Sequence, residues 1–288
     1  MVFDIKKLKP NQKEKIAIGA LKYIAIKESF EPETPLYKNE LFRKYFTDFY
    51  KLTRGAFSTP IMQEAFYRLF QSIRDLYDKK YNRYDLFKNI TTIISAIAGD
   101  NEKSFSSKIL HTLDNDSPII DSNVLSGLRI TSTTPYKDLR REYLYGSNIY
   151  KEYEKPIFDP SLSLSYCGGL IPIAIKDNWD VSFKELCLAE YGQILTSPSK
   201  KKGGITDIVK DIFRINCLKS STSTIDRLEK EIVIEEFFNK EKWIDEEVDG
   251  KETAKDYITK KIKDISLVKK IDFYLWAYFA QSVDKGHD

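Results

Sequence analysis

Cysteine and histidine are scarce in this sequence, which contains only three cysteines and two histidines. Cys167, Cys187 and Cys217 lie far apart in the chain, so they form neither a disulfide framework nor the four-cysteine cluster of an iron–sulfur protein. His111 and His287 are too few for a zinc site made of histidine and cysteine alone. We therefore expect no metal and no other cofactor, and we expect any chemistry to use carboxylates, lysines and hydroxyls.

Long apolar runs are absent as well. No segment approaches the roughly 20 apolar residues that a membrane span requires. The first residues, MVFDIKKLKPNQKEK, lack the apolar stretch and the small-residue cleavage site of a signal peptide. Together these absences predict a cytoplasmic protein that has no membrane partner.

The chain has little excess charge of either sign. Its 46 basic and 43 acidic side chains leave a net charge of +3. This balance neither predicts nor excludes a nucleic-acid partner, because DNA binding needs a basic face rather than a basic average. The clearest basic run is SPSKKKGG, which starts at Ser197. Its three lysines either belong to a solvated linker or contact phosphates: Lys200, Lys201 and Lys202.

Helical periodicity, by contrast, covers most of the chain. After Pro60, apolar residues recur every four positions from Ile61 to Ile73, and Phe66 and Phe70 widen this stripe, which is typical of one face of a helix. A first helix is predicted to begin near Pro10. Further helices are predicted over 36–50, 84–98, 103–113, 205–218, 224–240, 251–263 and 266–282, with another beginning near Asp121. The fold class that follows is mainly α, with one large domain or two intimate lobes.

Residues 156–183 interrupt the helical pattern. The run PIFDPSLSLSYCGGLIPIAIKDNWD contains three prolines, two adjacent glycines and short β-branched stretches. Such a composition predicts an irregular segment or a small β insert. Helical patterning resumes near Phe183.

The segment from Lys103 to Leu128 carries the residues with the clearest chemical potential. Asp121 stands before an apolar run, where its carboxylate would suit a helix N-cap. The same carboxylate would also suit catalysis if it faced a cavity. Lys103 opens a predicted helix, where it is either a solvated residue or a reactive amine close to the positive end of the helix dipole.

This segment resembles the catalytic segment of the helix-hairpin-helix (HhH-GPD) DNA glycosylases, especially the 8-oxoguanine-glycosylase-like branch. In that family a helical hairpin leads through a loop to an apolar-Pro-apolar-Asp element, which here reads Pro118-Ile119-Ile120-Asp121-Ser122-Asn123-Val124. Asp121 matches the catalytic aspartate, and Lys103 matches the lysine nucleophile at the start of the second hairpin helix better than Lys108 does. The run from Lys270 to Trp276 resembles the closing helix of bacterial proteins with this fold, some of them linked to phage defence.

The resemblance implies a single glycosylase-like domain over 1–288, made of two helical lobes, with the hairpin and catalytic segment at 96–128. Its implied activity is excision of a modified or damaged base from double-stranded DNA by a monomer that flips the base out of the stack. Asp121 and Lys103 are then the catalytic residues. The implied DNA contacts are Lys108, Asn123, Lys200, Lys201 and Lys202.

The hairpin of this chain differs from the Gly-apolar-Gly of the family, since Ala98-Gly99-Asp100-Asn101-Glu102 contains a single glycine. We therefore expect mainly base release, leaving an abasic site, with weak strand cleavage by an amine. The resemblance to defence proteins suggests an enlarged base of phage DNA, such as a glucosylated cytosine. The insert at about 156–204 would then supply pocket walls. The alternative is a non-catalytic helical protein that retains the scaffold and binds DNA or a protein.

Overall fold

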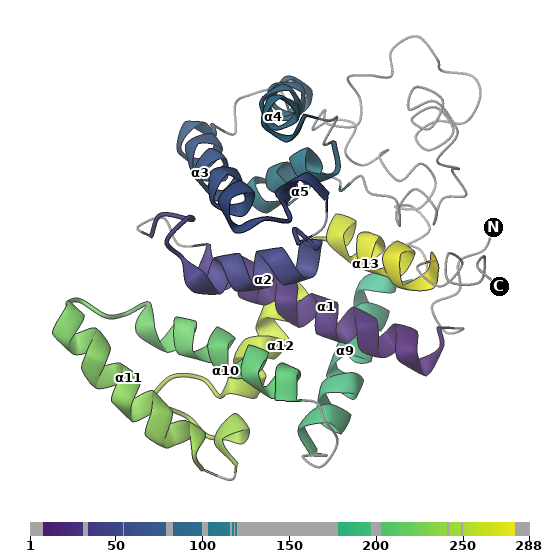
Figure 1. Ribbon diagram of the computed structural model, residues 1–288. Coiled ribbons are helices and arrows are strands. Elements are labelled where there is room, and N and C mark those ends of the chain that lie inside the picture. Colours follow the sequence, from purple (N-terminus) through teal and green to yellow (C-terminus); the bar gives the residue numbers. More distant parts are fainter. Residues whose placement is uncertain are drawn as a thin grey trace. The chain divides into compact units, whose positions relative to one another are not determined.

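The computed structural model describes the chain at residues 8–30, 34–53, 55–78, 83–99, 103–115, 117, 119, 178–196, 203–240, 242–248 and 250–279. Within these ranges the protein is mainly helical, with ten α-helices, two short 3-10 helices and no strand beyond an isolated bridge between Val248 and Lys251 (Figure 1). The sequence prediction of a mainly α protein is confirmed. None of the helices in this part of the chain is long and apolar enough to cross a membrane.

The chain divides into two compact units. Unit 1 comprises Met1–Ile16, Tyr50–Phe183 and Ser266–Asp288, and unit 2 comprises Ala17–Phe49 and Lys184–Ile265. Three boundaries fall inside helices, namely α1 (Pro10–Ser29), α9 (Trp179–Thr196) and the last residue of α2 (Glu40–Tyr50). Each of these helices therefore contributes residues to both units.

Unit 1 is built around aromatic side chains. Its helices are α3 (Pro60–Leu76), α4 (Arg83–Ala98), α5 (Lys103–Leu113) and α13 (Leu267–Phe279), preceded by the 3-10 helix η2 (Gly55–Phe57). The ring of Phe57 lies 5.0 Å from that of Phe66 and 5.6 Å from that of Phe105, measured between ring centroids. Phe66 and Phe105 are 5.8 Å apart. One ring cluster thus joins η2, α3 and α5, and buried aromatic pairs of this kind contribute beyond their buried area.

Helix α3 buries most of the predicted apolar stripe but not its first residue. Thr59 caps the helix by accepting a hydrogen bond from the Met62 amide at 3.3 Å, and Pro60 occupies the first turn. The predicted stripe began at Ile61, but that side chain is 80 % exposed. The buried face runs through Phe66, Tyr67, Phe70 and Ile73, of which all but Tyr67 belong to the predicted stripe. The larger rings occupy the core, and the stripe is rotated toward them.

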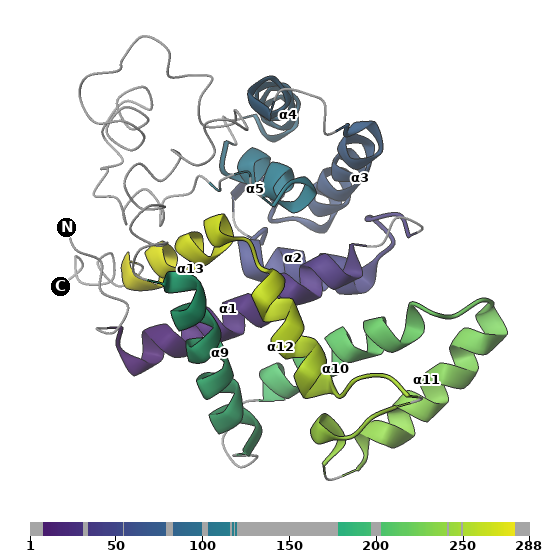
Figure 2. The same cartoon turned by 180° about the vertical axis from the view of Figure 1, so that it is seen from behind.

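Unit 2 packs seven helical segments around its own core. Besides parts of α1 and α9, it contains α2 (Glu40–Tyr50), α10 (Gly203–Leu218), α11 (Thr224–Phe238), α12 (Ala254–Asp264) and the 3-10 helix η5 (Trp243–Asp245). Helices α10 and α11 lie side by side in both opposite views (Figure 1, Figure 2). The Phe213 ring of α10 lies 6.0 Å from Phe237 and 6.5 Å from Phe238 of α11.

A buried carboxylate, Glu28, ties three segments of unit 2 together. Its side chain is 6 % exposed and accepts a hydrogen bond from the Tyr257 hydroxyl at 2.5 Å. The ammonium groups of Lys219 and Lys261 lie 2.5 and 2.8 Å from its oxygens. The contacts connect α1, the end of α10 and α12, so Glu28 satisfies the rule that a buried charge must be paired and hydrogen-bonded.

Asp211 is a second buried carboxylate of unit 2. It accepts a hydrogen bond from the Tyr45 hydroxyl at 2.5 Å and pairs with Lys44 at 2.9 Å. Burial raises the pKa of Tyr45, and the hydrogen bond to Asp211 raises it further. Arg214, one turn later on α10, lies 3.4 Å from the same carboxylate. These contacts hold α2 against α10.

The helix boundaries agree with the sequence prediction in most places. Helix α1 begins at Pro10, as expected, and α5 has the predicted bounds of 103–113. Helix α2 starts at Glu40 rather than near 36, because Asn39 caps it by accepting a hydrogen bond from the Phe42 amide at 2.9 Å. Residues 156–177 lie outside the described ranges. The irregular segment predicted up to 183 was too long, because α9 already begins at Trp179.

The hairpin between α4 and α5 turns at Gly99. This residue follows the last residue of α4, has φ +74°, and donates a backbone hydrogen bond to the Ser95 carbonyl at 2.9 Å. A left-handed residue just after a helix is a common C-terminal cap, and glycine adopts it without steric strain. The one glycine of the hairpin is therefore needed for the turn itself.

We expect Gly99→Ala to lower the free energy of unfolding by about 1 kcal/mol, because a Cβ at positive φ is strained. An added Cβ would meet no atom within 4 Å at either Gly99 or Gly192, so a steric clash with neighbouring atoms does not explain the expected loss of stability at Gly99. Gly192 lies inside α9, where alanine is the better helix former, and Gly192→Ala should stabilise by roughly 0.5–1 kcal/mol. Urea unfolding of the two variants checks this contrast in sign. A loss of stability of the same size in both would contradict it.

Candidate active site

The hairpin formed by α4 and α5 is the part of unit 1 that bears the predicted catalytic lysine. Lys103 is the first residue of α5, so the prediction that a helix begins with this lysine is confirmed. Its side chain lies outside what the structure describes, as do residues 100–102.

Helix α5 is buried on all sides. From Phe105 to Thr112 every side chain is buried, and the run includes hydroxyls, an imidazole and an amine as well as apolar residues. The Ser107 hydroxyl donates to the Ser104 carbonyl, and the Thr112 hydroxyl donates to the Lys108 carbonyl, both at 2.8 Å. Buried polar groups persist in a fold only when they have such partners. Helix α5 therefore brings polar groups into the centre of unit 1.

The turn after α5 is held by polar contacts. His111 Nδ1 and the Ser117 carbonyl oxygen are 2.5 Å apart, and the Ser117 hydroxyl donates to Asp114 at 3.1 Å. The Ser266 hydroxyl, just before α13, donates to the Asn115 carbonyl at 2.9 Å. The end of α5 is thus attached to the start of α13, two segments far apart in the sequence.

Lys108 points its amine into an aromatic environment. The residue is only 7 % exposed, and its Nζ donates to the Ser104 hydroxyl at 3.0 Å. The same nitrogen lies 4.9 Å from the centroid of the Phe105 ring and 5.6 Å from that of Tyr50. These distances are within the range of cation–π interactions, which strengthen as water is removed.

Lys269 approaches the same tyrosine from α13. It is 1 % exposed, and its Nζ lies 5.6 Å from the centroid of the Tyr50 ring and 4.8 Å from that of Phe273. Its ammonium group pairs with Asp272 at 2.5 Å, one turn along the helix. A buried charge without such a carboxylate would be strongly destabilising. Lys108 and Lys269 therefore place two amines around one buried ring.

The adjacent Lys270 has a packing role. It is 2 % exposed and pairs with Asp180, whose side chain is largely exposed. Its Nζ also lies 5.9 Å from the Phe183 ring, which in turn lies 5.7 Å from the rings of Phe273 and Tyr274. These contacts attach the start of α9 to α13. They agree with a structural function for the closing helix.

This arrangement is suited to chemistry that uses an amine. A lysine that is shielded from water by rings and lies near another cation is the kind that serves as a nucleophile in covalent catalysis. Lys108 has the first feature, since Phe105 and Tyr50 lie beside its amine, and Lys269 approaches the same Tyr50 ring from α13. Among the described residues no group of three or more histidine, cysteine, aspartate or glutamate side chains is arranged to hold a metal ion.

Several residues predicted from the sequence lie outside the described ranges, and their roles remain predictions. They are Asp121, Asn123, Lys200, Lys201 and Lys202. The predicted helix start near Asp121 lies there too. Lys108, predicted as a DNA contact, is well described and buried, and its role on DNA also remains a prediction.

We call Lys108, Lys269 and the Tyr50 ring between their helices the lysine cluster. The sequence analysis did not single out Tyr50 or Lys269. Tyr50 is the last residue of α2, and nothing in its neighbourhood distinguishes it from the other tyrosines. Lys269 carried a weak signal, because the pair Lys269-Lys270 interrupts an otherwise apolar helix, LVKKIDFYLWAYF. Two consecutive lysines with apolar residues on both sides cannot both face water if the whole helix is buried.

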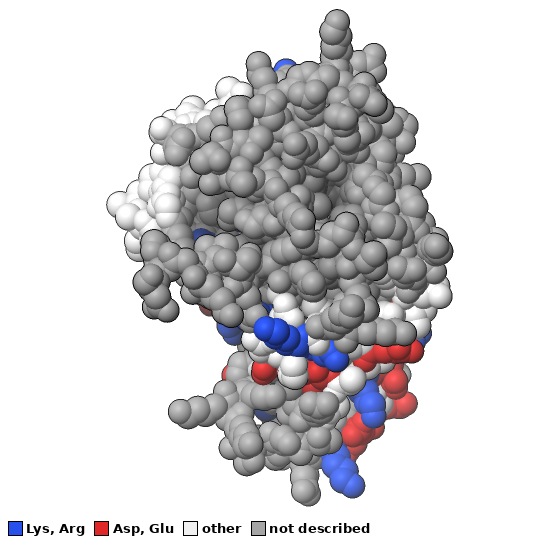
Figure 3. Space-filling model, turned by 90° about the vertical axis from the view of Figure 1, so that its right-hand side faces the viewer, with Lys and Arg blue, Asp and Glu red and all other residues white. Residues whose placement is uncertain are grey.

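The described surface carries both positive and negative side chains. On the face drawn in Figure 3, Lys and Arg side chains lie beside Asp and Glu side chains. Unit 2 contains a cavity of about 250 Å³ between α2, α10 and α11, and its walls also mix the two signs. The charged residues among its lining are Lys38, Glu40, Arg214, Arg227 and Glu231.

The chain was compared with protein families, curated proteins and solved structures. No family model, no curated protein and no solved structure matches it.

Proposed function

We propose that this protein is a DNA glycosylase that removes a modified or damaged base from double-stranded DNA and leaves an abasic site. The observation that carries the proposal is the buried amine of Lys108 on α5, the second helix of a hairpin, beside the rings of Phe105 and Tyr50. The match of the segment ending in Asp121 to the HhH-GPD pattern supports the same reading. We place this activity in a cytoplasmic monomer with two helical lobes of the HhH-GPD type.

The proposed chemistry divides the work between Asp121 and the basic residues. As the C1′–N bond breaks, positive charge develops on the sugar, and the Asp121 carboxylate stabilises it electrostatically. The same carboxylate orients and deprotonates the attacking water. Lys103, at the start of α5, contacts the DNA backbone, as do Asn123 and the lysines at 200–202. Lys108 is the amine of α5 best suited to attack C1′ in the minor, strand-cleaving reaction.

The proposed substrate is an enlarged base of phage DNA, such as a glucosylated cytosine. Extruding a base requires a few kilocalories per mole, and a bulky base also needs a wide pocket. We assign pocket walls to the segment within 156–204 that has no counterpart in the HhH-GPD pattern. The competing proposal is a helical protein that binds DNA or another protein without catalysis, and the single glycine of the hairpin favours it.

An abasic-site assay on three duplexes tests the proposal. The duplexes carry glucosylated cytosine, 8-oxoguanine or only the four ordinary bases. We expect abasic sites in the glucosylated duplex and a background level in the ordinary one. Equal numbers of abasic sites in all three duplexes would contradict the substrate assignment, and none in any duplex would favour the non-catalytic alternative.

Borohydride trapping tests the assignment of the amines. A Schiff base between a lysine and C1′ is reduced in place and leaves the protein covalently attached to DNA. We expect trapping to be slower than base release, to disappear in Lys108→Gln and to persist in Lys103→Gln, which should mainly weaken DNA binding. Circular dichroism confirms that both variants fold. Efficient trapping that disappears only in Lys103→Gln would reverse the two assignments.

A further inference from the structure

Helix α11 presents apolar side chains to solvent. Ile225, Leu228 and Ile232 are 70 %, 55 % and 62 % exposed. Their spacing of three and then four residues places them on one face of the helix. We call these three residues the α11 stripe. Single exposed apolar residues are ordinary, but a row at helical spacing is typical of a surface that binds a partner.

The core of unit 2 does not account for the α11 stripe. The face of α11 that packs inward contains Ile234, Phe237 and Phe238, and both rings contact Phe213 of α10. An ideal α-helix has 3.6 residues per turn, and with this periodicity the inward face lies on the side of α11 opposite the stripe. Helix α11 is therefore apolar on two sides, and only one of them is used within unit 2.

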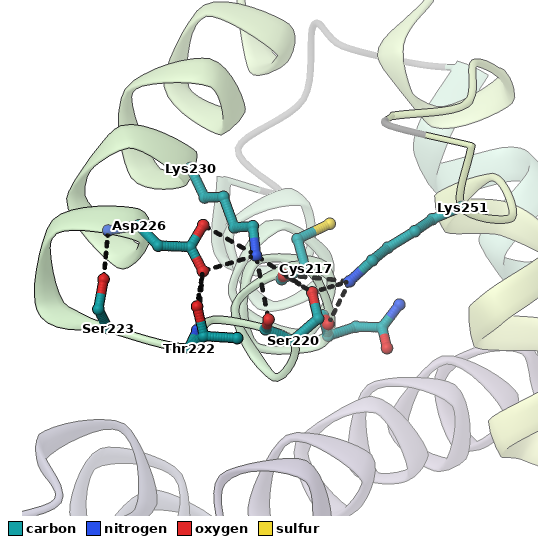
Figure 4. A network of polar contacts seen from close by, with 8 residues as sticks. Cys217, Ser220, Thr222, Ser223, Asp226, Lys230 and Lys251 are labelled. Atoms are coloured by element: carbon teal, nitrogen blue, oxygen red, sulfur yellow. Dashed lines mark hydrogen bonds and ion pairs between the residues drawn. The ribbon is translucent and has the colours of Figure 1, made fainter.

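The start of α11 is fixed by a polar network (Figure 4). Ser223 caps the helix by accepting a hydrogen bond from the Asp226 amide at 3.1 Å, and Asp226 accepts one from the Thr222 amide at 2.7 Å. The Thr222 bond lowers the pKa of Asp226, and the bond from Lys230 lowers it further. Lys230 also donates to the Ser220 carbonyl at 3.2 Å. A surface held in this way loses little conformational entropy when a partner binds.

Glutamates border the α11 stripe on both sides. Helical geometry places Glu229 and Glu236 along one edge, and Glu231 and Glu235 along the other. Glu229 and Glu236 are exposed and form no ion pair with any described residue. The edge formed by Glu231 and Glu235 is partly neutralised by arginines. The stripe is thus an apolar strip with one negative edge, formed by Glu229 and Glu236, because Arg227 pairs with Glu231 and Arg214 with Glu235 on the other.

We propose that the α11 stripe binds an amphipathic helix of a partner protein whose apolar face is flanked by lysines or arginines. Apolar side chains of the partner would pack on Leu228 and Ile232, and its cations would lie opposite Glu229 and Glu236. Complementary flanking charges determine the choice of partner in paired helices. A second copy of this chain fits less well, because self-pairing brings glutamate edges together. The proposal is independent of the base-excision activity.

Two fluorescent peptides of about the length of α11 test the proposal with the full chain. Both have leucines at the spacing of the stripe, and their flanking positions are all lysine in one and all glutamate in the other. We expect the lysine peptide to bind at least about tenfold more tightly at low salt, and to weaken as salt screens the flanking charges. The chain has a net charge of only +3, so overall charge cannot produce this preference.

Variants locate the binding surface. Leu228→Ser with Ile232→Ser should weaken binding of the lysine peptide about tenfold, since two anchoring contacts are lost. Val233→Ser is the matched control, because Val233 is 44 % exposed on α11 but lies off the stripe. Glu229→Lys with Glu236→Lys should reverse the preference between the two peptides. All of these side chains are exposed, so the variants are expected to fold.

Three results would overturn the proposal. One is equal affinity for the two peptides, and another is binding that the Leu228 and Ile232 substitutions leave unchanged. The third is a dimer in analytical ultracentrifugation that Ile232→Ser dissociates, which would identify a second copy of the chain as the occupant.

Discussion

Asp121→Asn is expected to lower base release by at least about a hundredfold, the effect of removing one preorganised electrostatic contact to the transition state. Asparagine retains the shape of the side chain and still caps a helix, but it cannot carry the negative charge that stabilises the sugar cation. Folding and DNA binding should therefore be nearly unchanged. Single-turnover release of glucosylated cytosine measures the effect, and circular dichroism and DNA binding by anisotropy accompany it.

Asp114→Asn is the matched control for this experiment. Asp114 lies on the same connection after α5, where it accepts a hydrogen bond from the Ser117 hydroxyl. Its replacement changes the charge of the segment by the same amount as Asp121→Asn. We expect base release to stay within about threefold of the wild type, because a charge away from the reacting atoms has little effect on catalysis. Turnover retained in Asp121→Asn would assign the catalytic carboxylate elsewhere.

Glu28→Gln is expected to produce the largest loss of stability, about 2–4 kcal/mol at neutral pH, because it removes the negative charge and one of the two oxygens that hold Lys219 and Lys261 inside unit 2. Glutamine preserves the volume of the side chain, so the effect isolates the charge. Lys219 and Lys261 are partly exposed, which keeps the expected loss below that of a fully buried ion pair. Glu229→Gln, at an exposed position, should change stability by less than about 0.5 kcal/mol.

The contribution of Glu28 should also depend on pH. Burial alone would raise the pKa of this carboxyl, but the hydrogen bonds from Lys219, Lys261 and Tyr257 outweigh it and hold the pKa below its ordinary value of 4.5. A lowered pKa stabilises the fold above the ordinary value, and this stabilisation disappears as the pH falls through the lowered pKa. Urea unfolding of wild type and Glu28→Gln should therefore converge on acidification below pH 4.5. A difference that widens there would contradict this account.

Most of the helices of this fold were predictable from local patterns. The bounds of α5 follow from its own sequence, because a helix of this length needs only periodicity and suitable ends. The predicted start of α9, near Phe183, was too late. The prolines and glycines before Trp179 affect only the residues next to them, so the helix begins as soon as that run ends. On α3 the buried rings followed from the pattern, but the exposure of Ile61 did not, because the rings of Phe57 and Phe105 that cover Phe66 come from other segments.

The lysine cluster shows which part of a site the sequence could not predict. Lys108 and Lys269 are far apart in the chain, and their amines share the Tyr50 ring as a neighbour only because α5 and α13 both contact it. Lysine is almost never fully buried, so a reading based on residue type places both amines in solvent. The aromatic residues that shield them are equally plausible as ordinary core. Only packing brings these groups together.

The most direct test of base excision is to identify what the protein releases from DNA. A glycosylase cleaves the C1′–N bond and releases a free base, whereas a nuclease releases nucleotides and a binding protein releases nothing. We predict that mass spectrometry of a reaction on glucosylated phage DNA detects free glucosylated cytosine, in an amount equal to the abasic sites formed, and none with Asp121→Asn. If the wild-type protein binds this DNA and releases no free base, the central proposal is contradicted.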